Sequence, residues 1–228
     1  LVVAHRVWTQ STITHVTVAV RLSFQLLDQR SARILPDEPF PELGAAWAET
    51  ELAPVLPAAG VILSGISRGP SAALPGATGR LCVRRIEARA LQSVDPLLLL
   101  DETFPLGGSA DTRWFEIAAG APRSFDGTEW IRLEGFRAMP DSIESQIPDV
   151  IPRVRLGRVG PAPGAVAVVP MRADCLRIDA PTGVCAIVWR GHAPLGADGP
   201  AEHTVLVGVE RDARPVQWPP AWELRGDP

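Results

Sequence analysis

The chain of 228 residues contains no lysine, no tyrosine and no asparagine, so arginine supplies all 22 of its basic side chains. The absence of lysine excludes Schiff-base catalysis and the lysine of a phosphate-binding loop, and the absence of tyrosine excludes a tyrosine acid. The formal net charge is -4. Because the one basic cluster, formed by Arg84, Arg85 and Arg89, has no interleaved aromatic residues, we expect no nucleic-acid partner.

Cysteine is scarce, with three residues, Cys82, Cys175 and Cys185, spread widely along the chain. An odd number at such spacings indicates neither a disulfide framework nor a zinc ribbon. The four histidines also lack the spacing of metal ligands. We therefore expect no metal and no cofactor, and reduced cysteines that serve as small core residues.

Long hydrophobic runs are missing as well. No apolar stretch approaches the roughly 18 residues of a membrane-spanning helix, and the leucines at 97–100 are flanked by Asp95 and Asp101. The first residues do not resemble a secretory signal. With 46% hydrophobic and 21% charged residues, the composition predicts a globular, cytoplasmic protein with no membrane partner.

The residues that are present alternate in the manner of β-strands. From Val16 to Leu26 every even position is apolar and most odd positions are polar, which is the period of a strand with one buried face. Short segments of this kind, separated by turns rich in proline and glycine, favour an all-β or mostly β fold. We predict an antiparallel sandwich or open barrel of short strands, with one or two short helices, the first within 41–54.

The clearest local motif is a hairpin at 174–195. Leu176 and Ile178 alternate with polar neighbours in the first arm, which predicts one face in water, whereas the second arm is apolar at every position from Val184 to Trp189. A turn that pairs Asp179 with Val184 would place Cys175 opposite Val188, so no bridge to Cys185 is expected. The second arm is predicted to be central, with Trp189 in the core.

We predict a single β-rich domain over 1–228, with the most plausible seam at 119–127. The segments 95–127 and 140–152 are expected to be irregular. The proline-rich tail that ends near Trp222 is expected to run extended over the surface or to dock an aromatic side chain onto it.

A G-x-S-x-G pattern surrounds Ser67 and follows a predicted strand, as a nucleophile elbow requires. His192 and Asp198 could nominally complete a triad. However, Pro70 and Pro75 make the helix that must follow an elbow improbable, and the alternation of strands and helices typical of such hydrolases is missing. Serine hydrolysis is therefore the alternative hypothesis, and we expect no catalytic residue.

Four blocks, in order, resemble a bacterial family associated with type VI secretion and catalogued as domain of unknown function 2169. They are Val16-Thr-Val-Ala-Val-Arg-Leu-Ser-Phe24, Glu49-Thr-Glu-Leu-Ala-Pro54, Gly127-Thr-Glu-Trp-Ile-Arg-Leu-Glu-Gly-Phe136 and the hairpin with its Val188-Trp-Arg-Gly191. The family's longer middle region is reduced here to Phe104-Pro-Leu-Gly-Gly108.

The resemblance implies a non-enzymatic adaptor or chaperone. Such a protein would hold a toxic effector in the bacterial cytoplasm and help to load it onto a spike or tip protein, with no small-molecule substrate. A structural part of a contractile injection apparatus is a further alternative. Because large aromatic and arginine side chains anchor protein partners, the expected partner-binding residues are Trp114, Phe115, Trp130, Arg132 and Trp222.

Overall fold

The computed structural model describes eleven ranges of the chain: 1–36, 59–65, 78–85, 97–105, 111–117, 129–135, 142–148, 150–158, 167–195, 203–211 and 214–218. For a few residues in these ranges only the backbone is described, namely Asp111, Thr112, Trp114, Glu116, Ile117, Arg158 and Asp174. The described residues form strands and turns and contain no helix, so the predicted all-β class is confirmed. The helix expected within 41–54 and the seam at 119–127 lie outside the described residues.

The strands form three sheets. The large sheet follows the order β1 (Val2–Gln10), β2 (Ile13–Gln25), β14 (Val184–Pro194), β13 (Arg172–Asp179), β5 (Ala59–Gly65) and β8 (Asp111–Ile117), with β4 (Arg33–Ile34) beside β2. The mid-sized sheet follows β3 (Arg30–Ser31), β10 (Ser142–Gln146), β9 (Glu129–Glu134), β6 (Thr78–Arg85) and β7 (Leu97–Pro105). The small sheet follows β12 (Ala167–Val169), β11 (Val150–Arg158) and β15 (His203–Arg211).

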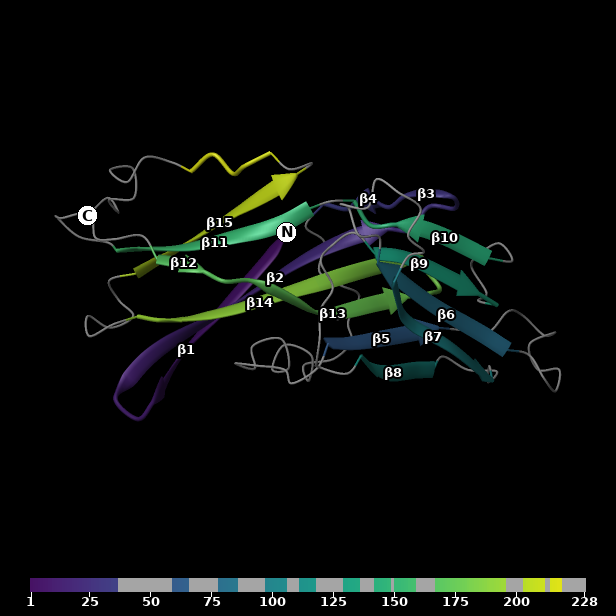
Figure 1. Cartoon of the computed structure of the whole chain (residues 1–228), viewed down its shortest axis with the longest axis horizontal. Coiled ribbons are helices and arrows are strands. Elements are labelled where there is room, and N and C mark those ends of the chain that lie inside the picture. The colour runs from purple at the N-terminus through teal and green to yellow at the C-terminus, as the bar shows by residue number, and fades with distance from the viewer. Residues whose placement is uncertain are drawn as a thin grey trace.

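The two smaller sheets share one hydrophobic core with the large sheet. Figure 1 shows the mid-sized sheet towards one end of the long axis and the small sheet towards the other. Buried side chains from all three sheets meet in one large apolar cluster, and Ile62, Cys175 and Val188 of the large sheet form a second, small one. The arrangement is an open sandwich rather than a barrel. Most pairings are antiparallel, as predicted, but β13 with β5 and β10 with β3 are parallel.

The hairpin of β13 and β14 has the predicted register. Asp179 faces Val184, and Cys175 faces Val188. The three cysteines are free and buried, as expected. The wet face predicted for the first arm is wrong, because Arg177 is only 3% exposed. Sequence alternation reveals which residues share a face of a strand, but it cannot tell whether that second face is also covered.

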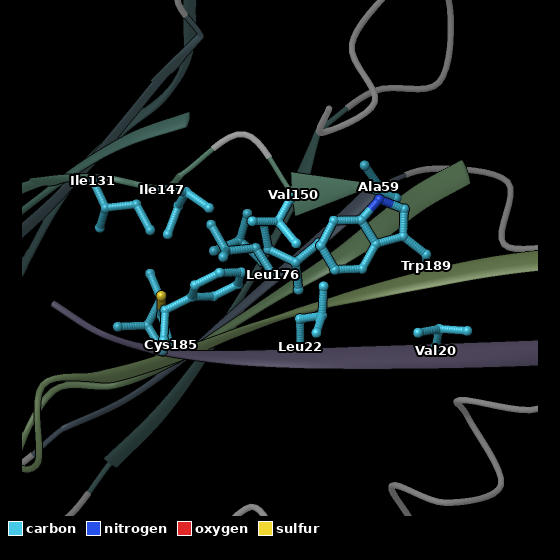
Figure 2. Close-up of a cluster of buried hydrophobic side chains, with 14 of the residues drawn as sticks. Val20, Leu22, Ala59, Ile131, Ile147, Val150, Leu176, Cys185 and Trp189 are labelled. Atoms are coloured by element: carbon cyan, nitrogen blue, oxygen red, sulfur yellow. The ribbon is translucent and has the colours of Figure 1, made fainter. Parts of the chain in front are cut away.

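Trp189 of β14 lies in the core, as predicted, and is 2% exposed. Figure 2 shows its indole ring among the labelled side chains of Ala59, Leu176 and Val150, while Ile131 and Ile147 of the mid-sized half lie towards Cys185. Burial of a large aromatic side chain is worth several kcal/mol, since about 25 cal/mol is gained per Å² of apolar surface removed from water. The central strand β14 is therefore the main anchor of the sandwich.

A charged pair is enclosed beneath the mid-sized sheet. The guanidinium of Arg85 lies 4.0 Å from the carboxylate of Glu129, whose side chain is 0% exposed. Cys185, a residue of β14, lies near enough to the pair to feel the charge of Glu129. Burial of its thiol, together with the negative charge of Glu129, raises the pKa of Cys185 far above its ordinary value. Cys185 therefore stays protonated in the folded chain and acts as an apolar core residue.

Two expectations of irregular segments are wrong. The segment 95–127 contains β7 and β8, and the segment 140–152 contains β10 and the start of β11. The first residues, for which no element was predicted, form β1. Two of these strands, β7 and β8, are edge strands, where one-sided burial weakens the alternating pattern. In β10 one of the two buried positions is the polar residue Ser145, which accepts a hydrogen bond from the backbone N–H of Leu27 and donates one to its carbonyl oxygen.

Candidate partner-binding surfaces

The structure disperses the residues expected to bind a partner. Phe115 lies on β8, at the edge of the large sheet, half-buried against the core and 6.0 Å from the ring centroid of Phe104. Trp114 precedes it on the same strand, paired with Ile62. Trp130 and Arg132 lie on β9 of the mid-sized sheet. Trp222 lies outside the described residues, so the five residues do not form one described surface.

The residues of the hydrolase alternative are only partly described. His192 lies exposed on β14, where it pairs with Thr17 of β2. Ser67 and Asp198 both lie outside the described residues. No described observation therefore brings a nucleophile, a base and an acid together. The described residues also contain no cluster of histidine, cysteine and carboxylate side chains that could hold a metal ion.

The outer face of the mid-sized sheet carries charges that are largely paired with one another. Arg80 binds Asp101 through two hydrogen bonds of 2.8 and 2.7 Å. The hydrogen bond from Arg80 holds the pKa of Asp101 below its ordinary value. Arg132 donates to Glu134 at 2.8 Å and lies 4.0 Å from Glu144. The partner-binding role predicted for Arg132 therefore competes with ion pairs on its own sheet.

The edge strand β1 offers a different kind of surface. It is nine residues long, and no described strand pairs with its outer edge. Proteins protect such edges with proline, charged side chains, bulges or short strands. β1 has no proline and no bulge, and Arg6 is its only arginine, lysine or carboxylate. It exposes Val3 and Val7, which are 40% and 37% exposed, next to His5 and Arg6. The strand carries no carboxylate, so an acidic segment would meet no repulsion from β1 itself.

The hairpin that presents β1 is held rigid at its far end. The indole N–H of Trp8 donates to the hydroxyl of Thr17 at 2.9 Å, and Thr17 is fully buried. The ring of Trp8 also stacks on His15, with ring centroids 4.6 Å apart and planes 14° apart. Figure 1 shows β1 running out towards one end of the molecule. A rigid, extended edge is preorganised for pairing with another strand.

A third surface lies on the outside of the small sheet. The segment 214–218 crosses this face, and the indole ring of Trp218 lies 4.5 Å from the guanidinium carbon of Arg155. Arg153, two residues along β11, binds Glu210 of β15 at 2.6 Å. Arg153, Arg155, Glu210 and Trp218 line an open pocket of about 210 Å³. The rest of its lining is apolar: Val154, Val168, Pro215 and Val216. The expectation that the tail docks an aromatic side chain is confirmed, for Trp218.

Sequence reasoning missed both β1 and the pocket. For β1 the available signal was that two segments, each mixing polar and apolar residues, flank Ser11 and Thr12 as the arms of a hairpin would. In the structure these two residues form the turn, and Ser11 has a positive φ of 57°. For the pocket, the alternation of Arg153 and Arg155 along β11 showed that they share a face. No local pattern links β11 to Trp218, about sixty residues later in the sequence.

Comparisons of this chain with protein-family models, with curated proteins and with solved structures found no match. The resemblance to the type VI secretion-associated family therefore rests on the four sequence blocks. No helix in the described part of the chain is long and apolar enough to cross a membrane.

Proposed function

We propose that this chain is a non-enzymatic adaptor that binds an extended segment of a partner protein along the edge of β1. The observation that carries the proposal is the outer edge of this nine-residue strand, with which no strand in the described part of the chain pairs. A partner strand that pairs there would extend the large sheet, with main-chain hydrogen bonds supplying affinity and side-chain contacts supplying specificity. The resemblance suggests that the partner is a toxic effector, held in the bacterial cytoplasm before loading onto a secretion spike.

The side chains of β1 define the partner segment. Val3 and Val7 point to the same face of the sheet, because their partners on β2 are Val20 and Val16. Apolar residues of the segment would cover these valines, and an acidic residue would meet Arg6 on the opposite face. The preferred segment is therefore an extended stretch in which apolar residues alternate with polar or acidic ones.

Co-purification with the proteins encoded by the neighbouring genes, to identify a captured effector, tests the proposal. The double variant Val3→Asp and Val7→Asp should abolish capture, because it replaces the apolar contacts with desolvated like charges. Leu97→Asp with Leu98→Asp is the matched control, since these residues are 40% and 52% exposed on β7, the edge strand of the mid-sized sheet. Equal loss of capture in both variants, or undiminished capture by the β1 variant, would refute the role of β1.

A further inference from the structure

The pocket on the small sheet depends on close packing of the segment 214–218 against β15. Val216 packs over Gly208 of β15 so closely that a Cβ atom placed on Gly208 would lie 2.2 Å from a methyl carbon of Val216. Any other residue at position 208 would push the segment away. Glycine therefore leaves the space that seats Val216, and the seated segment brings Pro215 and Trp218 into the pocket wall.

The two arginines of the pocket differ in their partners. Arg153 is bound to Glu210. Arg155 contacts the face of Trp218, and no described carboxylate forms an ion pair with it. A cation–π contact forms no hydrogen bond, so it leaves the N–H groups of the guanidinium able to donate. Arg155 therefore presents oriented donors beside an apolar wall.

The remaining lining is apolar and partly open to water. Val168 of β12, which pairs with Arg155, is 66% exposed. With Val216 and Trp218 it forms an apolar surface around the arginines. A ligand that satisfies the pocket must carry an apolar side chain for this wall and a carboxylate for Arg155. A carboxylate that bridges both arginines would also compete with Glu210 for Arg153.

We infer that this pocket binds a protein segment in which an aliphatic side chain adjoins a carboxylate. The mostly apolar lining and the carboxylate of Glu210 at the rim disfavour a nucleic-acid backbone, which binds surfaces of uncompensated positive charge. The site lies on the outer face of the small sheet and shares no residue with β1. It is thus a second docking point, beyond the proposed function, and would allow the chain to hold two protein segments at once.

Titration of the isotope-labelled full chain with the peptide acetyl-Glu-Leu-Glu-Leu-amide, followed by nuclear magnetic resonance, tests the inference. The side-chain N–H signals of Trp218 and Arg155 should shift with the peptide, and the same peptide with glutamine in place of glutamate should bind about tenfold more weakly. The signal of Trp218 is assigned from Trp218→Phe. The inference would be overturned if the glutamate peptide did not shift these signals, or if an oligothymidine shifted them more strongly.

Arginine variants locate the site. Arg155→Ala should weaken peptide binding about tenfold, whereas Arg80→Ala, which removes an arginine bound to a carboxylate on the mid-sized sheet, should leave binding unchanged. A dispersed amide spectrum establishes that each variant is folded, and Arg155→Gln repeats the test with less loss of packing. Equal binding by Arg155→Ala and the natural chain would contradict the assignment. Capture of the effector through β1 should survive Arg155→Ala, so the two proposals can fail separately.

Discussion

The mid-sized and small sheets pack against one shared core, but one arginine on the outer face of the small sheet is used differently. On the mid-sized sheet Arg80 and Arg132 are bound to carboxylates of the same face. On the small sheet Arg153 also binds a carboxylate, that of Glu210, whereas Arg155 contacts an aromatic ring contributed by the tail. Charges that satisfy one another leave little for a partner to gain. We therefore expect the mid-sized half to contribute more to stability, and this difference supports the proposals that place partner binding on β1 and on the small half.

The interiors of the two halves differ in the same sense. Beneath the mid-sized sheet, Glu129 and Ile131 of β9 are fully buried. In the small sheet, Val154 and Leu156 of β11 and Val169 of β12 are buried in the core. Its third strand, β15, is only partly buried against that core. A half that buries less apolar surface is held less tightly and opens at lower cost.

Removal of one partner of the buried ion pair should produce the largest effect. Glu129→Ala leaves the positive charge of Arg85 in an apolar interior, and it should lower the free energy of unfolding by about 3–5 kcal/mol. Glu144→Ala removes a half-exposed carboxylate of the same sheet and should cost less than about 1 kcal/mol. Urea unfolding of both variants measures the difference. Similar values would show that the mid-sized half is not the stabilising one.

Burial of the Cys185 thiol should make folding stability depend on pH in the alkaline range. The unfolded chain loses this proton above about pH 8.5, while the folded chain keeps it because its pKa is raised. Folding stability must therefore fall as pH rises through this range, by at most about 1.4 kcal/mol for each pH unit. Since the chain has no lysine and no tyrosine, the side chains that ionise in this range in the unfolded chain are its three cysteines. The slope should become smaller in Cys185→Ala and Cys185→Ser, and an unchanged slope in both variants would show that it does not arise from Cys185.

A smaller effect is expected from the tail of the small sheet. Gly208→Ala should displace the segment 214–218 and lower the free energy of unfolding by about 1 kcal/mol, because the clash is relieved by undocking. The Trp218 indole signal should move towards its value in an unfolded chain. Adding Val216→Ala removes the clashing methyl groups and should restore docking in part. If Gly208→Ala leaves the Trp218 signal unchanged, packing of Val216 on Gly208 does not hold the segment 214–218 in place.

The sequence predicted those elements whose pattern is set by a core contact. The register of the hairpin was predicted from the alternation of its residues and the length of its turn. The burial of Trp189 was predicted because every residue of its strand segment is apolar. Arg177 was misplaced because its burial depends on a cover that strand periodicity does not encode. The pocket was beyond reach, since it needs β11, Gly208 and Trp218 to meet in space.

Hydrogen exchange of the chain, alone and bound to its effector, tests the central claim most directly. If the effector adds a strand to the large sheet, the amides of β1 that face outward should exchange much more slowly in the complex, while those of β7 on the mid-sized sheet remain as they were. A stable complex in which the amides of β1 exchange as fast as in the free chain would contradict binding at this edge.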